Sequence, residues 1–201
     1  MLALSKHRNF FDFFLPPKFL TMSSVGIDLS DESVKFVELV ATEDGLRVGR
    51  FGEESIPDGA IFHGVIQNSQ LVEKSLGALQ KKYGLSFARI SCPEKETYLL
   101  ELPLPIATQD TLREAVNLQF EEYVPMKREE SLFDLDVVGV SEKKGIVRVQ
   151  VSAVSRVLAE KYETIFKNAG ITTIALEAES QALARAVTRE RETKAALVVD
   201  I

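Results

Sequence analysis

The stretch VGIDLSDESVKFVEL, residues 25–39, constrains the fold more than any other part of this chain. Apolar residues alternate on both sides of a polar break, Ser30-Asp31-Glu32-Ser33, which predicts two strands joined by a tight turn. Asp28 lies at the rim of that turn. Turns of this kind bind an anion when backbone N–H groups converge on it, and small residues let a phosphate approach closely. The turn therefore has the shape of a phosphate-binding loop, although its two carboxylates would repel a polyphosphate unless a metal ion lay between them.

Composition excludes several classes of protein. With 45% hydrophobic and 27% charged residues, the chain has the balance of an ordinary globular protein rather than a disordered one. A net charge of −6, without a run of Lys or Arg, argues against a nucleic-acid partner. The single cysteine, Cys92, excludes an intrachain disulfide and is expected to be a buried, inert thiol. The two histidines, His7 and His63, have no neighbours at ligand spacing, so a zinc site or a Cys-His nucleophile has no support.

Residues 1–24 form an N-terminal extension that differs in composition from the rest. The apolar run is too short and too interrupted for a transmembrane helix or a signal peptide, because Asp12 and the pair Pro16-Pro17 break it. Two interpretations stay open: an arm that docks on a membrane surface or a partner, or a segment that packs back on the body. Both depend on the five phenylalanines Phe10, Phe11, Phe13, Phe14 and Phe19.

From residue 25 onward, the pattern predicts an α/β protein in which strands and helices alternate with short loops. Thr108 is expected to cap one helix at its start, and Gly84 to end another. Beyond the first two strands, the predicted strands are 45–55, 87–91, 97–105, 131–141, 145–155, 171–177 and 195–201. The predicted helices are 69–83, 109–124, 156–169 and 180–191.

The order of these elements indicates two levels of organisation. The segment 97–154 reads strand, helix, strand, strand, which is a self-contained small unit inserted into one mixed α/β layer. The final apolar run, with Asp200 near its end, resembles a strand that leads to a ligand site in a further domain. The chain is therefore expected to be part of a longer protein.

Five pieces of the sequence together resemble the actin-like ATPases of the FtsA/PilM branch: VGIDLSDESVKFVEL, GVIQNSQLVEKSLGALQ, LQFEEYVPMKREESLFD, VSAVS and NAGITTIALEAESQALARA. The resemblance implies a ribonuclease-H-like subdomain over residues 25–93 and 155–193. It implies an inserted β-α-β-β subdomain of the SHS2 type over 94–154, and the first strand of a truncated second domain over 194–201. ATP and magnesium would lie between the two halves, and would be bound only when the second half is present.

The resemblance also assigns residues to the nucleotide site. Asp28 and Asp200 would face the metal, and Glu177 would orient the attacking water as the catalytic residue. Glu177 can equally be a solvated residue in the first turn of a helix, where the helix dipole favours a carboxylate. The loop departs from the family at Ser30, where glycine is usual, and at Asp31 and Glu32, where small hydroxyl residues are usual. The remaining nucleotide-binding residues implied are Ser30, Ser33 and Lys35.

For partners, the resemblance implies the N-terminal peptide of a PilN-like membrane protein, held in a groove between the main subdomain and the insertion. Aromatic and methionine side chains at the end of helix 109–124 are the candidate anchors: Phe120, Tyr123, Val124 and Met126. Among these, Phe120 and Val124 are expected to face the small sheet, whereas Tyr123 and Met126 are the expected exposed pair.

The implied function is a cytoplasmic scaffold at the inner face of the bacterial plasma membrane, within a type IV pilus assembly complex or a related secretion machine. It would bind ATP in its full-length form, with weak or no hydrolysis, and self-association is a further expectation. The alternative is an FtsA-like cell-division or cytoskeletal protein with ATPase or polymerising activity. A sugar kinase shares the main fold, but no sugar-binding acid–base constellation is present in the sequence.

Overall fold

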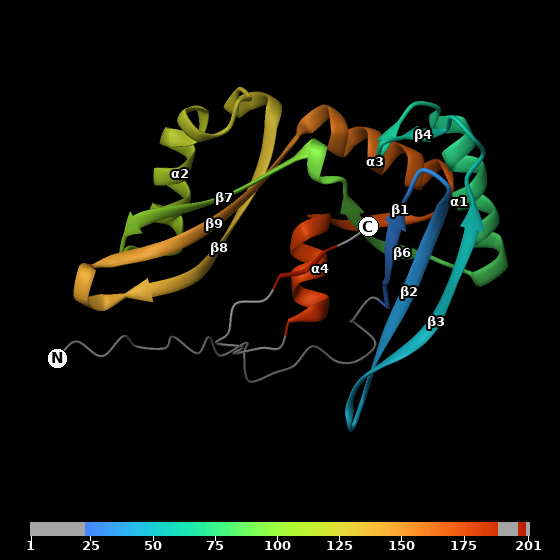
Figure 1. The fold of residues 1–201 in the computed structure, drawn as a ribbon, viewed down its shortest axis with the longest axis horizontal. Coiled ribbons are helices and arrows are strands. Elements are labelled where there is room, and N and C mark those ends of the chain that lie inside the picture. The colour runs from blue at the N-terminus through green and yellow to red at the C-terminus, as the bar shows by residue number, and fades with distance from the viewer. Residues whose placement is uncertain (1–22, 189–196, 200–201) are drawn as a thin grey trace.

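The computed structural model describes residues 23–188 and 197–199, and these form two α/β units joined side by side (Figure 1). The larger unit contains a five-stranded sheet, and the smaller unit contains a three-stranded sheet with one helix. A short hairpin, β4 (Ile61–Phe62) with β5 (Val65–Ile66), lies at the edge of the larger unit. None of the described helices is long and apolar enough to cross a membrane.

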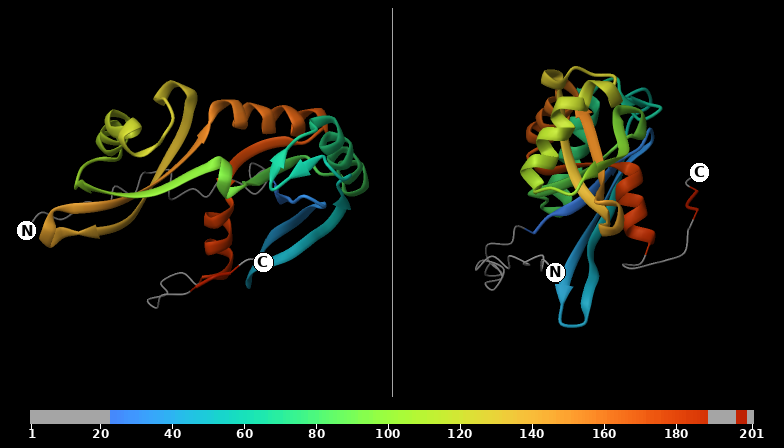
Figure 2. Two further views of the ribbon diagram at one scale, coloured as in Figure 1. Left: turned by 45° about the horizontal axis from the view of Figure 1, so that its top comes forward. Right: turned by 90° about the vertical axis from the view of Figure 1, so that its left-hand side faces the viewer.

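The larger sheet has the strand order β10-β6-β1-β2-β3. The strands β1, β6 and β10 run parallel to one another, whereas β2 and β3 continue from β1 as an antiparallel meander. β1 pairs with β2 only as far as Glu38, so the outer parts of β2 and β3 extend together beyond the other strands (Figure 2). The bounds of the strands are β1 Val25–Leu29, β2 Ser33–Thr42, β3 Gly45–Ser55, β6 Phe87–Cys92 and β10 Thr172–Ala178.

Two helices cover one face of this sheet, α1 (Ser69–Tyr83) and α3 (Arg156–Asn168). α1 begins where the side chain of Asn68 accepts the N–H of Leu71, and it ends at Gly84, whose φ of 66° is left-handed. The alternation of buried and exposed residues in β1 places one side of each strand in the core. The largest fully buried side chains of this core include Leu76, Leu79, Ile90, Tyr162 and Phe166.

The opposite face of the sheet carries only α4 (Glu179–Val187) among the described residues. α4 follows directly from β10 and lies over its carboxyl end and that of β6 (Figure 1). The part of this face on β2 and β3 is open, and it bears the exposed apolar side chains Val37, Leu39, Val48 and Phe51. The sheet is thus closed on one side and largely open on the other.

The smaller unit has the predicted order strand, helix, strand, strand. Its sheet has the order β7-β9-β8, with all pairs antiparallel, and α2 covers one face. Thr108 caps α2 as predicted, because its side chain accepts the N–H of Thr111. The chain enters this unit through a short 3-10 helix, η3 (Glu94–Glu96), and leaves it at the start of α3. Its elements are β7 Thr97–Pro105, α2 Gln109–Tyr123, η4 Arg128–Glu130, β8 Ser131–Ser141, η5 Glu142–Lys144 and β9 Ile146–Ser155.

One predicted element stays a prediction, because the resemblance assigns it to a second domain that would supply its neighbouring strands. The terminal strand expected over 195–201 is not formed by Leu197–Val199, which are exposed and pair with no strand of the described sheets. A strand exists only through hydrogen bonds to a neighbour, and apolar sequence alone cannot supply one. Asp200 and most of the N-terminal extension lie outside the described residues. Cys92 is buried, as predicted.

Candidate functional site

A cleft of about 650 Å³ lies between α4 and the open face of the larger sheet. Asp28, Ser91 and Glu177 stand near the carboxyl ends of β1, β6 and β10, which are parallel neighbours, so all three line the same end of the cleft. Ligands of open α/β sheets bind beyond the carboxyl ends of parallel strands. The polar and charged residues that line this cleft are Ser24, Asp28, Lys35, Arg89, Ser91, Glu177, Glu179 and Arg185.

Asp28 occupies the centre of this arrangement. One of its carboxylate oxygens accepts a hydrogen bond from the hydroxyl of Ser91 at 2.5 Å. Lys35 is its direct cross-strand partner on β2, and Arg89 lies two residues before Ser91 on β6. Within residues 23–188 and 197–199, neither cation forms an ion pair. Asp28 therefore lies in a cleft with two cations, Lys35 and Arg89, that form no ion pair among the described residues.

Glu177 forms an ion pair, whereas the resemblance implies that it orients the attacking water. Both of its carboxylate oxygens accept hydrogen bonds from the guanidinium group of Arg185, which lies in the last turn of α4. This contact raises the pKa of Arg185, and it occupies the oxygens that would orient a water molecule. Glu177 lines the cleft and in this arrangement is an ion-pair partner, and its catalytic role stays a prediction.

The loop between β1 and β2 is closed by its own hydrogen bonds. The N–H of Ser30 donates to the carbonyl of Ser33 at 2.9 Å, and the N–H of Ser33 donates to the hydroxyl of Ser30 at 3.1 Å. Neither serine lines the cleft, and Ser33 is buried. The two serines therefore shape the loop, while Asp28 and Lys35 on the flanking strands face the cleft.

Asp31, in the same loop, forms an interaction that the sequence did not indicate. Its Oδ2 accepts the N–H of His63 and its Oδ1 accepts the N–H of Gly64, each at 2.8 Å. These two backbone hydrogen bonds lower the pKa of Asp31, with that from Gly64 the larger cause. One of the two carboxylates that argued against phosphate binding, that of Asp31, is thus directed at the turn between β4 and β5. Glu32 remains exposed, and its carbonyl accepts the N–H of Ile56.

A second, smaller cavity of about 190 Å³ lies where the two units meet, and we call it the junction pocket. One wall is Gly64, Val65 and Ile66; the others come from Glu96, just before β7, and from the start of α3. Lys161 bridges two walls, because its Nζ donates to the carbonyl of Ile66 at 2.7 Å. The pocket is also lined by Ser155, Val157, Leu158 and Tyr162. Both chain crossings between the two units therefore border it.

The four predicted peptide anchors do not form one exposed surface. Phe120 and Val124 are each only 2% exposed and pack with Ala153 against the small sheet, so they are core residues and unavailable as anchors. Met126 is partly buried against the same cluster, whereas Tyr123 is 50% exposed. The position around the helix explains why Phe120 and Val124 are buried while Tyr123 is exposed. Val116, Phe120 and Val124 follow one another every four residues and so lie on the same, buried side. None of the four lines the junction pocket.

A magnesium ion bound with a nucleotide needs one or two carboxylates, with phosphates and water as its other ligands. Asp28 fits that role, since its only hydrogen-bond donor among the described residues is the Ser91 hydroxyl. No group of three or more His, Cys, Asp or Glu in the described part of the chain could hold a metal by itself. The described residues thus supply part of a metal–nucleotide site.

Comparison with solved structures places this architecture. The protein in a structure described as the PilM–PilN type IV pilus biogenesis complex matches with a TM-score of 0.70 at 16% identity, over 81% of this chain and 49% of that chain. The cytoplasmic domain of EpsL, an inner membrane component of the type II secretion system of Vibrio cholerae, matches with a TM-score of 0.56 at 12% identity, over 84% of this chain and 60% of that chain. The fold is that of an actin-like ATPase, present here as an incomplete domain.

The sequence itself defines the family more closely. The family model of the type IV pilus assembly protein PilM matches residues 26–197, so the chain belongs to the PilM family. It spans about half the length of the PilM chain to which its fold was compared, which corresponds to the 49% coverage.

Proposed function

We propose that this chain is the N-terminal part of a cytoplasmic scaffold for type IV pilus assembly, located at the inner face of the bacterial plasma membrane. In its full-length form it binds ATP and recruits a PilN-like membrane protein. The observation that carries the nucleotide part is the cleft at the carboxyl ends of β1, β6 and β10, with Asp28 at its centre. The family match supports the pilus part.

In the proposed nucleotide site, the residues have distinct tasks. Asp28 would hold magnesium directly or through water, with Ser91 fixing the orientation of its carboxylate. Lys35 and Arg89 would neutralise phosphate oxygens, because both are cations of the cleft. Asp200 would approach from the second half. Bound magnesium would reduce the repulsion between the phosphates and Asp28.

The geometry favours binding over rapid hydrolysis. Hydrolysis needs a group that orients the attacking water, and Glu177, the candidate, is paired with Arg185 through both carboxylate oxygens. Turnover would require that pair to open. The proposed role is therefore a nucleotide-bound scaffold with slow hydrolysis.

For the partner, the junction pocket is the better candidate than the end of α2. It has apolar walls from Val65, Val157 and Leu158, and Val157 is 75% exposed. A short apolar side chain could enter between these walls, while Lys161 and Glu96 at the rim could bind the polar backbone of a peptide. We propose that this pocket receives an anchor of a PilN-like N-terminal peptide, and that the exposed ring of Tyr123 provides a separate contact.

Calorimetry with Mg-ATP tests the nucleotide part. A full-length protein that includes the second half should bind, and Asp28→Ala should weaken binding at least about tenfold, since it removes a metal-facing carboxylate. Asp136→Ala is the matched control, because Asp136 is exposed on β8, outside the cleft. Residues 1–201 alone should show no micromolar binding. Equal affinity of the Asp28→Ala variant and the wild type would contradict the assignment.

A further inference from the structure

The turn between β4 and β5 has a backbone that is suited to hold a carboxylate. His63 and Gly64 both have left-handed φ values, 50° and 78°, and their successive N–H groups point at Asp31. Successive N–H groups in such a conformation form a concave anion site. A positive φ is unfavourable for histidine, so the turn depends on the charge that it binds. We call these two hydrogen bonds the Asp31 clamp.

The Asp31 clamp joins two places that the proposed function uses separately. On one side, Asp31 belongs to the loop that Ser30 and Ser33 close beside the nucleotide cleft. On the other, Gly64 is a wall of the junction pocket. The carboxylate of Asp31 thus contacts two backbone amides that are distant from it in the sequence: that of His63, 32 positions away, and that of Gly64, 33 positions away.

The connection continues toward the crossing between the two units. A Cβ atom at Gly64 would lie 3.1 Å from Cβ of Pro93, so the turn packs closely on the residue that starts η3. Glu96, at the end of η3, is again a wall of the junction pocket. The turn and η3, which supply two walls of the pocket, are therefore closely packed on one another.

A second link runs in parallel to the first. Ser91 donates to Asp28 at 2.5 Å, and Ser91 lies two residues before Pro93. Two acidic residues of the β1–loop region are thus connected to the segment 91–96 that leads into the smaller unit, Asp28 through Ser91 and Asp31 through the turn that packs on Pro93. Ser91 lines the nucleotide cleft and Glu96 lines the junction pocket, so this segment borders both sites. An element that borders two sites is a physical route by which they can be coupled.

We infer that the Asp31 clamp couples the nucleotide cleft to the junction pocket, so that occupancy of either site changes affinity at the other. The inference rests on the proposed function and extends it to regulation. It also gives a reason for an acidic residue in this loop: Asp31 is directed at the turn and serves as a positioning residue for both sites.

Amide hydrogen exchange of residues 1–201, measured by NMR, tests the clamp without a ligand. Asp31→Asn keeps one acceptor oxygen and loses the charge, so the amides of His63 and Gly64 should exchange about tenfold faster or more. Glu32→Gln is the matched control, since Glu32 is the exposed neighbour in the same loop. Wild-type exchange at both amides in Asp31→Asn would overturn the inference.

The second arm uses the N-terminal cytoplasmic peptide of the PilN protein from the same organism. Binding to the wild type should slow exchange at Ser30 and Ser33, and Asp31→Asn should abolish that effect and raise Kd about fivefold or more. Glu32→Gln should behave as the wild type. Bound peptide without any change at Ser30 and Ser33, or wild-type affinity in Asp31→Asn, would overturn the coupling.

A peptide that fails to bind the wild type would contradict the proposed function instead. In that case the Gly64→Ala substitution perturbs the turn in place of the peptide, because the added Cβ would press on Pro93 and shift the turn. Faster exchange at Ser30 and Ser33 in Gly64→Ala would support the coupling. Unchanged exchange there would overturn it.

Discussion

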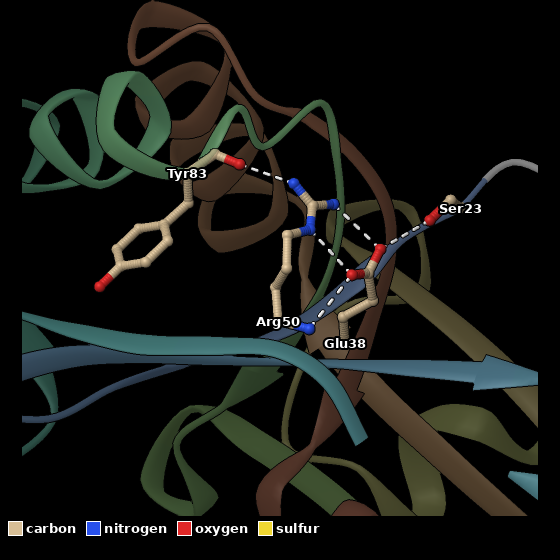
Figure 3. A network of polar contacts seen from close by, with 4 residues as sticks. All are labelled: Ser23, Glu38, Arg50 and Tyr83. Atoms are coloured by element: carbon tan, nitrogen blue, oxygen red, sulfur yellow. Dashed lines mark hydrogen bonds and ion pairs between the residues drawn. The ribbon is translucent and has the colours of Figure 1, made fainter. Parts of the chain in front are cut away.

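Glu38 and Arg50 form an ion pair across β2 and β3 in which each carboxylate oxygen has its own guanidinium donor (Figure 3). Nε of Arg50 donates to Oε2 at 2.8 Å, and the second terminal nitrogen donates to Oε1 at 2.9 Å. The other terminal nitrogen donates to the carbonyl of Tyr83, the last residue of α1, at 2.6 Å. The hydroxyl of Ser23 also donates a hydrogen bond to Oε1 of Glu38. The pair therefore ties the meander to the end of α1 and to the start of β1.

This pair predicts a specific pH dependence of stability. Hydrogen bonds from Arg50, and then from Ser23, lower the pKa of Glu38 from 4.5 to about 2. A lowered folded-state pKa stabilises the fold above the unfolded value, and the contribution is lost as pH falls from 4.5 through about 2. Glu38→Gln should therefore cost about 1 kcal/mol at pH 7, a value reduced by the partial exposure of Arg50.

Urea unfolding at several pH values measures this effect. The difference between the wild type and Glu38→Gln should shrink as pH falls from 4.5 to about 2, because the carboxyl group becomes protonated first in the unfolded state and then increasingly in the folded state. Glu43→Gln, at the exposed tip of the same hairpin, should show no such difference. A constant difference from pH 7 to pH 2 would indicate that shape rather than charge stabilises the contact.

Gly52 and Gly77 should respond in opposite ways to alanine. A Cβ at Gly52 would lie 2.7 Å from the ring of Tyr83 and 2.8 Å from that of Phe36, which are themselves in edge contact. Gly52→Ala should destabilise the protein by about 1–3 kcal/mol through overpacking. Gly77 is within α1 with nothing within 4 Å of its Cβ position, so Gly77→Ala should stabilise by about 0.5–1 kcal/mol. Thermal unfolding compares the two, and a lower midpoint for Gly77→Ala would contradict the open space there.

Local patterns predicted most of the fold because each depends on neighbours in the sequence. The helix 69–83 is correct to its ends, since Gly84 and the apolar spacing are both local signals. The insertion was predicted from its element order, which also needs no long-range contact. The burial of Phe120 followed from its position on the inner face of α2.

The site was harder to predict, because its contacts are distant in sequence. No sequence spacing indicates that Asp31 binds the N–H groups of His63 and Gly64. The site needs a positive φ at both residues, and a histidine in the sequence does not predict one. Glu177 and Arg185 are eight residues apart across a strand–helix boundary, where helical spacing rules do not apply. The pairing of Asp28 with Lys35, in contrast, lies within one hairpin that the sequence pattern predicts, while their role in nucleotide binding stays a prediction.

Cys92 should be nearly inert in the folded protein. Burial, and secondarily the charge of Glu96, raises the pKa of its thiol to about 12, so almost no thiolate exists at pH 8. Iodoacetamide should therefore label the native protein very slowly and the urea-unfolded protein rapidly. The single cysteine makes the assay unambiguous. Fast labelling of the native protein would show that the region around β6 opens in solution.

The peptide surface can be located with three substitutions. Val157→Asp should abolish binding of a PilN-like peptide if the junction pocket holds its anchor, and Tyr123→Ala should weaken it by about 1–3 kcal/mol. Both side chains are at least half exposed, so the thermal midpoint should hardly change. Phe120→Ala, in contrast, should cost about 3–5 kcal/mol of stability because it empties a core position. Full binding by a folded Val157→Asp variant would exclude the pocket.

The chain enters and leaves the smaller unit at one pair of directly facing residues in the sheet of that unit. Thr97, at the start of β7, is the direct partner of Val154, near the end of β9. Paired residues in antiparallel strands lie about 5 Å apart at Cα, so a connection of one or two residues could replace the whole unit. Deletion of the residues between Thr97 and Val154 would leave the order and the connections of the five strands in the larger sheet unchanged. The strand order of the larger sheet therefore includes no strand of the smaller unit, which is a separable insertion in topological terms.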